Sequence, residues 1–218
     1  MKAIVVIGAG GLGREALDIL KRSLHHTYKI LGFIDDNIEL HGTIINDYPV
    51  LGGCEWFKEN PNTLAVCAIG DNYIRKSVTD RAKENGANFT SVIDPSATIG
   101  YGLKIGEGVI IVQGNTITSN VTIGNHVYVN IDCSVAHDDV LEDYVNICPG
   151  VQLSGNVTLK EGVMVYTGAI IAPGVTVGKW AEVGAGAVVL KDVPDYMLVA
   201  GIPANIKKDV RSRHNWKT

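Results

Sequence analysis

An aliphatic residue returns at every sixth position over nearly half of this chain, and this period constrains the fold more than any other feature. Seventeen consecutive positions of the period carry only Ile, Val or Leu, with no insertion between them. A run of this length does not arise by chance, so it reports a structural repeat. The positions are Ile93, Ile99, Ile105, Ile111, Ile117, Ile123, Val129, Val135, Leu141, Ile147, Leu153, Leu159, Val165, Ile171, Val177, Val183 and Val189.

A six-residue period is neither the period of a helix nor the two-residue period of a strand. A short strand followed by a turn does produce it. The side chain four places after each aliphatic position is usually small or Val, and Gly is frequent in between, where the chain must bend. We therefore expect a β-solenoid in which the aliphatic column points inward and stacks on itself from coil to coil.

The repeat resembles the hexapeptide [LIV]-[GAED]-x-x-[STAV]-x of left-handed β-helix acyltransferases, and it continues without a break over residues 93–194. The resemblance implies a left-handed parallel β-helix with three hexads in each coil, so that residues three hexads apart become vertical neighbours. It also implies a homotrimer whose active sites lie between adjacent prisms, with acetyl-CoA as the co-substrate.

Residues 1–92 follow a different pattern, in which short apolar strands alternate with helices. Strand and helix alternation predicts an α/β domain, a small Rossmann-like βαβαβ unit with a parallel sheet. Residues 37–60 are ambiguous and suggest a loop followed by a short helix. Strands are expected at 2–7, 29–34, 63–69 and 89–93. One helix is expected at 14–24 with Leu17, Leu20 and Leu24 on its apolar face, and another after Asp71 or Asn72 with Ile74, Val78 and Ala82 on its apolar face.

A glycine loop, Gly8-x-Gly10-x-x-Gly13, lies between the first expected strand and the first helix. Glycine lets the backbone approach an anion at a helix N-terminus. Asp35 follows Gly13 by 22 residues and ends the next strand, where a carboxylate can bind a ribose hydroxyl or a base edge. The short sheet disfavours a complete nicotinamide dinucleotide fold. A tight turn without a ligand is the simple alternative.

A glycine-loop domain before a hexapeptide solenoid resembles the sugar N-acetyltransferases of bacillosamine and perosamine synthesis and the related sialic acid O-acetyltransferases. The matching motifs are the glycine loop, Asp35-Asp36, and residues 68–72 followed by Arg75. Some relatives carry His where this chain has Leu12, so any contact of that His with the acceptor is absent here. The resemblance implies that the acceptor is bound by Gly8, Gly10, Gly11, Gly13, Asp35, Asp36, Gly70, Asp71, Asn72 and Asn130.

Acetyl transfer to an amine or hydroxyl requires a base, and histidine suits that role near neutral pH. The stretch from Asn130 to Asp138 resembles the family's Asn-x(6)-His-[Glu/Asp] catalytic segment. The resemblance implies that His137 is the general base and that Asp138 orients its ring. His126 occupies the fourth, outward place of its hexad, and we expect it on the surface.

Gly155 follows His137 by three hexads, so in a three-hexad coil it lies directly beside that histidine. A glycine there leaves space for the thioester and exposes an N–H for the developing oxyanion. The alternative is an ordinary turn glycine. Asp139 falls at the inward fifth place of its hexad, where a carboxylate is costly unless it is hydrogen-bonded. It either braces the His137 region or faces the prism corner and water.

The resemblance implies that the coenzyme lies along a groove lined by small residues near the end of the repeat. Lys191, Lys207 and Lys208 can pair with its phosphates, although solvated lysines are the commoner case. Residues 195–218 are expected to form a coenzyme-contacting tail, after domains 1–92 and 93–194, and its part from Asn205 onward is expected to be helical at first. The coenzyme-binding residues implied are Asn146, Gly155, Gly184, Ala185, Gly186, Gly201, Pro203 and Lys208.

The activity expected first is direct acetylation of the 4-amino group of a nucleotide-activated amino-dideoxy sugar. O-acetylation of sialic acid or another sugar is the nearest alternative. A β-helix carbonic anhydrase needs three converging histidines, and the solenoid contains only His126 and His137, so no metal site is expected. The His-Asp pair also disfavours a non-catalytic scaffold.

Charge and composition limit the location and the partners. A net charge of −4 disfavours nucleic acid as a partner. No apolar run reaches the length of about 18 residues that suggests a transmembrane helix, and glycines interrupt the apolar N-terminus too early for a secretory signal. The four cysteines show no paired spacing, which favours reduced thiols and a cytoplasmic location.

Overall fold

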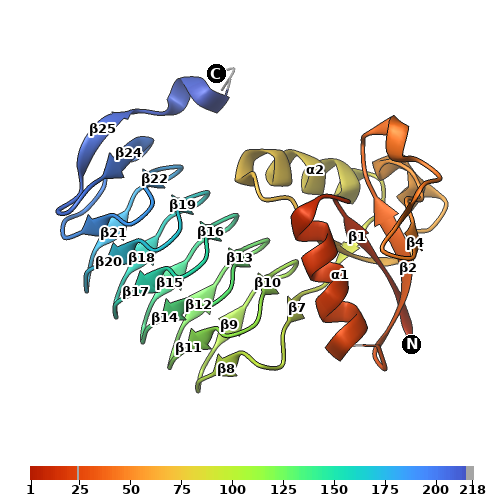
Figure 1. Cartoon of the computed structure of the whole chain (residues 1–218), viewed down its shortest axis with the longest axis horizontal. Helices are drawn as coiled ribbons and strands as arrows, with labels where there is room; N and C mark the ends of the chain where they lie inside the picture. The colour runs from red at the N-terminus through yellow and green to blue at the C-terminus, as the bar shows by residue number, and fades with distance from the viewer. Residues whose placement is uncertain (24, 215–218) are drawn as a thin grey trace. The chain divides into compact units, whose positions relative to one another are not determined.

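The computed structural model describes residues 1–23 and 25–214, which form two compact units (Figure 1). One unit comprises Met1–Asp94 with Glu107–Ile110, and the other comprises Pro95–Gly106 with Ile111–Thr218. Leu24, expected on the apolar face of the first helix, lies outside the described residues, as do residues 215–218 of the tail.

The first unit is the expected Rossmann-like α/β domain with a parallel sheet. Its strands pair in the order β2-β1-β5-β6, and all three pairings are parallel. The ambiguous residues 37–60 form short elements that include a hairpin and a final 3-10 helix. In chain order the elements are β1 (Lys2–Ile7), α1 (Gly11–Ser23), β2 (Tyr28–Ile34), η1 (Ile38–Leu40), β3 (Ile44–Ile45), β4 (Tyr48–Pro49), η2 (Cys54–Lys58), β5 (Leu64–Cys67), α2 (Asn72–Glu84), β6 (Asn88–Phe89) and β7 (Val92–Ile93).

Local sequence explains where the two long helices begin and which faces they bury. In α1, Leu17 and Leu20 are buried as predicted. The side chain of Asp71 caps α2 by accepting hydrogen bonds from the backbone N–H groups of its first turn. Val78 is buried as predicted, and so is Ala82. The same prediction for Ile74 is wrong, because this first-turn side chain is 54% exposed.

The second unit is a parallel β-helix of two-residue strands separated by turns. Each strand pairs in parallel with the strand three hexads away, for example Thr116 with Ser134 and Ser134 with Gln152. This pairing confirms the prediction of three hexads in each coil. The strands are β8 (Thr98–Ile99), β9 (Lys104–Ile105), β10 (Ile110–Ile111), β11 (Thr116–Ile117), β12 (Thr122–Ile123), β13 (Tyr128–Val129), β14 (Ser134–Val135), β15 (Val140–Leu141), β16 (Asn146–Ile147), β17 (Gln152–Leu153), β18 (Thr158–Leu159), β19 (Met164–Val165), β20 (Ile170–Ile171), β21 (Thr176–Val177), β22 (Glu182–Val183) and β23 (Val188–Val189).

Three sheets form the faces of the prism. One face carries β13, β16, β19 and β22, the second runs from β8 to β23, and the third runs from β9 to β21. Every member of the aliphatic column from Ile111 to Val189 is at most 2% exposed, so this column is the core. The sequence period therefore identified the inward side chains correctly.

The corners of the prism need a left-handed backbone conformation. The fourth residue of each hexad from Gly102 to Gly186 has a φ between 54° and 78°, a region that Gly, Asn and Asp tolerate best. His126 lies at such a corner, but the prediction that it is exposed is wrong: it is 1% exposed. Its ring stacks on Tyr144 one coil later, with 5.3 Å between the ring centroids, and aromatic packing therefore buries it.

The tail differs from its prediction. Strand β24 (Met197–Ala200) adds to β22 in parallel, and β25 (Asn205–Asp209) then pairs with β24 in an antiparallel hairpin. A helix was expected to begin at Asn205, and this is wrong, because Asn205–Asp209 form β25. A strand at the end of a sheet offers unpaired N–H and C=O groups, and β25 uses those of β24. The 3-10 helix η3 (Arg211–His214) follows.

Candidate active site

His137 and Asp138 lie at the corner between β14 and β15, which we call the catalytic corner. His137 Nδ1 is 2.8 Å from Asp138 Oδ2. Asn120, one coil earlier, donates from Nδ2 to Asp138 Oδ1 over 3.4 Å. Because Nδ1 donates its proton to the carboxylate, Nε2 carries the free lone pair and can accept a proton. Both side chains are solvent-accessible, at 61% for His137 and 48% for Asp138.

The hydrogen bond between His137 and Asp138 also keeps the Asp138 carboxyl group ionised. It is the main cause that holds the pKa of Asp138 below its usual value, and the bond from Asn120 acts in the same direction. Asp138 is therefore an anion at neutral pH. An anion in this position can orient the imidazole ring, and it would stabilise an imidazolium if Nε2 took up a proton.

Gly155 lies directly beside His137, as the three-hexad spacing predicts. A Cβ atom on Gly155 would lie 2.5 Å from both Cε1 and Nε2 of the imidazole, so only glycine leaves the ring in this position. Asn156 N–H donates to the His137 carbonyl over 3.0 Å and ties the two coils together. The Nε2 edge of the ring therefore faces the Gly155 backbone.

Asp139 is fully buried behind the catalytic corner. Its carboxylate accepts the backbone N–H of Ala136 and that of Val157, each over 2.8 Å. Burial raises the pKa of Asp139 to about 6, against the opposing effect of these two hydrogen bonds. Of the two alternatives for this residue, exposure of the carboxylate to water is wrong, because the side chain is fully buried.

The cysteines offer no thiolate nucleophile. Burial raises the pKa of Cys54 and of Cys133 to about 11 and that of Cys67 to about 12, and it also raises the pKa of Cys148. All four thiols are neutral at neutral pH, and a neutral thiol is a poor nucleophile. Among the described residues, no cluster of His, Cys, Asp or Glu is suited to hold a metal ion.

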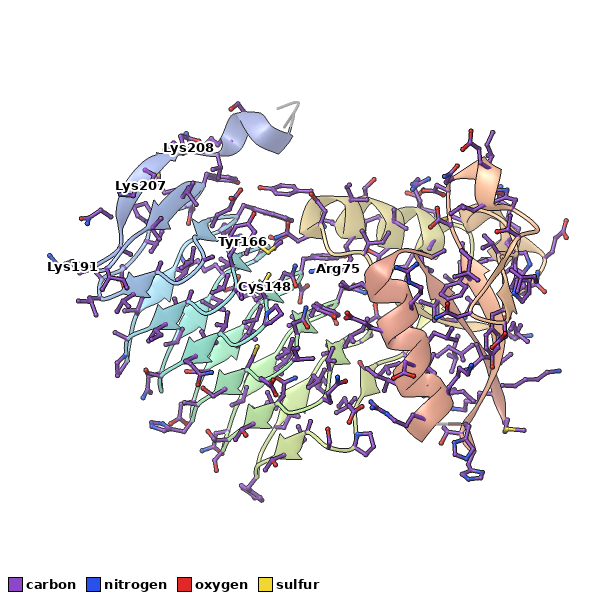
Figure 2. All side chains as sticks on the ribbon, in the orientation of Figure 1. Arg75, Cys148, Tyr166, Lys191, Lys207 and Lys208 are labelled. Atoms are coloured by element: carbon purple, nitrogen blue, oxygen red, sulfur yellow. The ribbon has the colours of Figure 1, made fainter. Side chains whose placement is uncertain are left out.

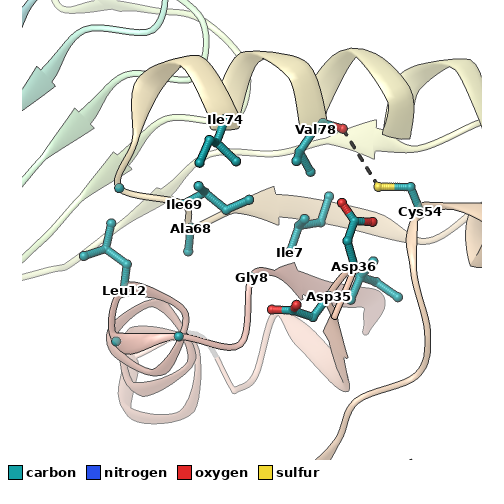
Figure 3. Close-up of a pocket in the computed structure, with 14 residues that line it drawn as sticks. Ile7, Gly8, Leu12, Asp35, Asp36, Cys54, Ala68, Ile69, Ile74 and Val78 are labelled. Carbon is teal, nitrogen blue, oxygen red and sulfur yellow. Dashed lines mark hydrogen bonds between the residues drawn. The ribbon is translucent and has the colours of Figure 1, made fainter. Parts of the chain in front are cut away.

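A cavity of about 500 Å³ opens in the first unit above the glycine loop (Figure 3). Its lining joins the predicted glycine loop and acidic pair to an apolar wall. Gly13 and Asp71, also predicted to bind the acceptor, are not part of this lining and have structural contacts: a Cβ on Gly13 would overlap the Gly8 carbonyl, and Asp71 caps α2. Asn72 is buried and is not part of the lining. The lining consists of Ile7, Gly8, Gly10, Gly11, Leu12, Ile34, Asp35, Asp36, Cys54, Ala68, Ile69, Gly70, Ile74 and Val78.

The two aspartates of the cavity already carry protein contacts. Asp35 Oδ2 accepts the N–H of Ala9 over 2.8 Å, and its Oδ1 accepts the N–H of Asn37 over 2.9 Å. Asp35 thus fastens the glycine loop to the end of β2. Asp36 forms an ion pair with Arg81. Both carboxylates border the cavity and retain further lone pairs for a ligand.

Sequence reasoning missed part of the cavity wall. Cys54 and Val78 lie side by side in this wall, and Cys54 Sγ lies 4.0 Å from the Val78 carbonyl (Figure 3). Cys54 belongs to the ambiguous segment, where no periodicity marks an inward side chain. Asn120 was also missed, although it precedes Asp138 by the same three hexads that separate Gly155 from His137.

The residues expected to bind the coenzyme, apart from Asn146 and Gly155, lie at another corner, between β22 and β23, with the hairpin β24–β25 beside it. We call this the glycine corner. Gly184 allows close approach of β24, because a Cβ on it would lie 2.9 Å from Ala200 Cβ. Gly186 and Gly201 both have positive φ. Lys191, Lys207 and Lys208 lie at this end of the solenoid (Figure 2). Ala185 and Pro203 are exposed in the same region.

Two further predicted residues lie away from the catalytic corner. Asn130 Oδ1 accepts the N–H of Ile131 over 2.8 Å, in the turn between β13 and β14. Asn146 is 5% exposed, and its Nδ2 lies 3.3 Å from Met164 Sδ. Within the described residues, a single solenoid does not bring these asparagines or the glycine corner to His137.

Comparison with known proteins agrees with both units. Residues 3–82 match the family described as PglD N-terminal domain, and residues 156–191 match the family described as bacterial transferase hexapeptide (six repeats). A GDP-perosamine N-acetyltransferase of Escherichia coli O157:H7 is 32% identical over 175 residues, which cover 78% of each chain. The chain belongs to the hexapeptide-repeat sugar acetyltransferases.

Solved structures of such sugar acetyltransferases have the same fold over nearly their whole length. One is a His→Asn mutant of perosamine N-acetyltransferase from Caulobacter crescentus in complex with CoA and GDP-perosamine. It has a TM-score of 0.88 and 30% identity, covering 96% of this chain and 98% of that chain. Another is the acetyltransferase domain of PglB from Neisseria gonorrhoeae FA1090 in complex with acetyl coenzyme A, with a TM-score of 0.85, 32% identity and coverage of 94% and 99%. The expected left-handed β-helix is thereby confirmed.

The described part of this acetyltransferase has no helix that combines the length and the apolar character needed to cross a membrane.

Proposed function

We propose that this acetyltransferase transfers an acetyl group from acetyl-CoA to the 4-amino group of a nucleotide-linked amino-dideoxy sugar, with His137 as general base. The observation that carries the proposal is the contact between the His137 ring and Gly155, with Asp138 on the opposite ring nitrogen. This arrangement leaves one basic nitrogen beside an open stretch of backbone, where an acceptor and a thioester have room to meet.

The proposed reaction is a direct displacement. The acceptor amine attacks the thioester carbonyl carbon, His137 Nε2 removes a proton from the nitrogen, and the C–S bond breaks to release the coenzyme thiolate. The Gly155 N–H donates to the carbonyl oxygen as negative charge develops on it. The proton held by His137 then passes to the thiolate. The neutral, buried cysteines support direct transfer over an acyl-cysteine intermediate.

Two features support a nucleotide-linked acceptor. The cavity of the first unit joins a glycine loop at a helix N-terminus, which suits a pyrophosphate, to an apolar wall with two carboxylates, which suits a base and ribose. Two similar structures of perosamine N-acetyltransferase from Caulobacter crescentus are complexes with CoA and GDP-perosamine. We therefore assign the cavity to the nucleotide of the acceptor.

The coenzyme is assigned to the glycine corner. Gly184 and Gly186 leave room for the pantetheine arm, and Lys191, Lys207 and Lys208 supply positive charge for its phosphates. Because His137 and the glycine corner lie at different corners of one prism, a neighbouring copy must supply one of the two to a complete site. This separation supports the homotrimer expected from the resemblance, and the free cysteines favour the cytoplasm.

Incubation of the full chain with acetyl-CoA and a panel of UDP-, GDP- and dTDP-linked 4-amino-4,6-dideoxy sugars tests the proposal. Release of the free thiol is followed with a chromogenic reagent, and the product is identified by mass spectrometry. We expect one acceptor to gain an acetyl group that survives mild base, as an amide does. An acetyl group lost in mild base would identify an ester and favour O-acetylation. No thiol release with any acceptor would contradict the proposal.

A further inference from the structure

The buried Asp139 interrupts the hydrogen-bond pattern of the solenoid at the catalytic corner. Along the β-helix, the second residue of each hexad donates its N–H to a carbonyl one coil later. In the same column as Ala136, Thr118 N–H donates to Val135 O over 2.9 Å, and Ser154 N–H donates to Ile171 O over 3.1 Å. Within residues 100–172, all of which the structure describes, the one exception is Ala136.

Ala136 donates instead to the side chain of Asp139. Its N–H is 2.8 Å from Asp139 Oδ2, so the residue immediately before His137 leaves the regular ladder. The other oxygen, Oδ1, accepts the N–H of Val157 over 2.8 Å. Val157 follows Gly155 by two residues. One carboxylate thus links the backbone beside the base to the backbone beside Gly155.

The chain contains a matched comparison in Asn115. This residue also occupies the buried fifth place of its hexad, and its Oδ1 accepts the N–H of Cys133 one coil later over 3.0 Å. Its Nδ2, however, donates to the carbonyl of Val112, and the Val112 N–H keeps its ladder bond to Val129. A polar residue at the fifth place is therefore compatible with an unbroken ladder, and the interruption at Ala136 is specific to the carboxylate.

A role in folding alone does not explain a carboxylate here. A buried anion costs free energy even when it is hydrogen-bonded. The same place is filled by Val in the coils directly before and after, Val121 and Val157, both fully buried. The coils on either side thus bury an apolar side chain at this place. Beside His137 the chain buries the carboxylate of Asp139, which costs more free energy.

We propose that Asp139 is a positioning residue, which holds the His137 backbone out of the regular ladder and in line with Gly155 so that the base meets the thioester. This inference rests on the proposed acetyl transfer. The titratable groups near this carboxylate are His137 and Asp138, and both belong to the same corner.

The test compares Asp139→Val and Asp139→Ala with the control Asn115→Val in the acetyl transfer assay. In both Asp139 variants we expect Ala136 to regain its ladder bond, the thermal midpoint to equal or exceed that of the unmodified protein, and kcat to fall about 10- to 100-fold. The KM for acetyl-CoA and for the acceptor should change less than about 3-fold, because the binding surfaces are untouched. Asn115→Val should keep the original kcat.

Several results would overturn the inference. These are an unchanged kcat in folded Asp139 variants, an equal loss of kcat in Asn115→Val, or failure of both Asp139 variants to fold, which would make the residue a requirement of the fold alone. The unmodified protein is assayed alongside. Its inactivity would contradict the proposed function, whereas an active unmodified protein with equally active Asp139 variants contradicts only the positioning role.

Discussion

Replacement of Gly155 by Ala tests whether activity needs the open space beside His137, because the substitution should fill that space without destabilising the coil. The new Cβ would lie 2.5 Å from Cε1 and Nε2 of the imidazole, whereas carbon atoms pack at about 3.5–4.0 Å. The ring must therefore move by about 1 Å or more. Gly155 does not have a positive φ, so Ala is compatible with its backbone, and the half-exposed imidazole can turn toward solvent.

The expected consequence is a large loss of activity at little cost in stability. A displacement of about 1 Å at a reacting group can lower the rate by about 100-fold, and we expect kcat/KM to fall by that factor or more. The free energy of unfolding should change by less than about 1 kcal/mol, since a solvent-accessible side chain relieves the overlap. The N–H of residue 155 is retained in the variant. A loss of activity would therefore come from displacement of the His137 ring and not from removal of this hydrogen-bond donor.

Steady-state kinetics of Gly155→Ala, His137→Ala and the double variant measure this effect. If Gly155→Ala acts by displacing the imidazole, the double variant should be about as slow as His137→Ala alone, because neighbouring residues that act through one group are not additive. Normal kcat/KM in Gly155→Ala would show that the reaction does not depend on the position of the His137 ring beside residue 155. Additive losses in the double variant would assign Gly155 a role separate from His137.

Three further outcomes follow from the described contacts. Asp138→Asn should lower kcat about 10-fold with unchanged coenzyme affinity, because an amide cannot stabilise the imidazolium; isothermal titration calorimetry and kinetics check this, and a normal kcat contradicts it. Gly13→Ala should destabilise the first unit by about 3 kcal/mol, since its Cβ overlaps the Gly8 carbonyl; unchanged hydrogen exchange in β1 would argue against this. Because burial raises the pKa of Asp139 from 3.8 to about 6, the folded protein keeps a proton that the unfolded chain loses, and stability falls as pH rises through that window. Relative to Asp139→Val, the free energy of unfolding of the unmodified protein should fall by about 3 kcal/mol over this pH range in denaturant titrations. Parallel plots of unfolding free energy against pH for the two proteins would contradict this.

The repeat was the most predictable part of the molecule. A strict period of six requires the same strand and turn in every coil, so the inward column and the place of Gly155 beside His137 could be worked out by counting. Vertical neighbours depend only on the number of hexads in a coil. For the same reason, Asn120 beside Asp138 could have been found from the sequence.

Features that depend on tertiary packing could not be read from the period. His126 occupies an outward place, yet the Tyr144 ring one coil later covers it. The tail carries no apolar alternation, and only the free edge of β24 makes residues 205–209 a strand. Asp139 was placed inward correctly, but the two N–H groups that it accepts come from Ala136 and from Val157 one coil later, and no sequence pattern names them.

The most direct test of His137 as the base is the turnover of His137→Ala with acetyl-CoA and the preferred acceptor, with and without added imidazole. Loss of a general base costs about 100- to 10,000-fold. We expect the turnover of His137→Ala to fall by that factor, with an unchanged dissociation constant for the coenzyme and partial recovery of turnover when imidazole occupies the space beside Gly155. Turnover at the level of the unmodified protein would contradict this.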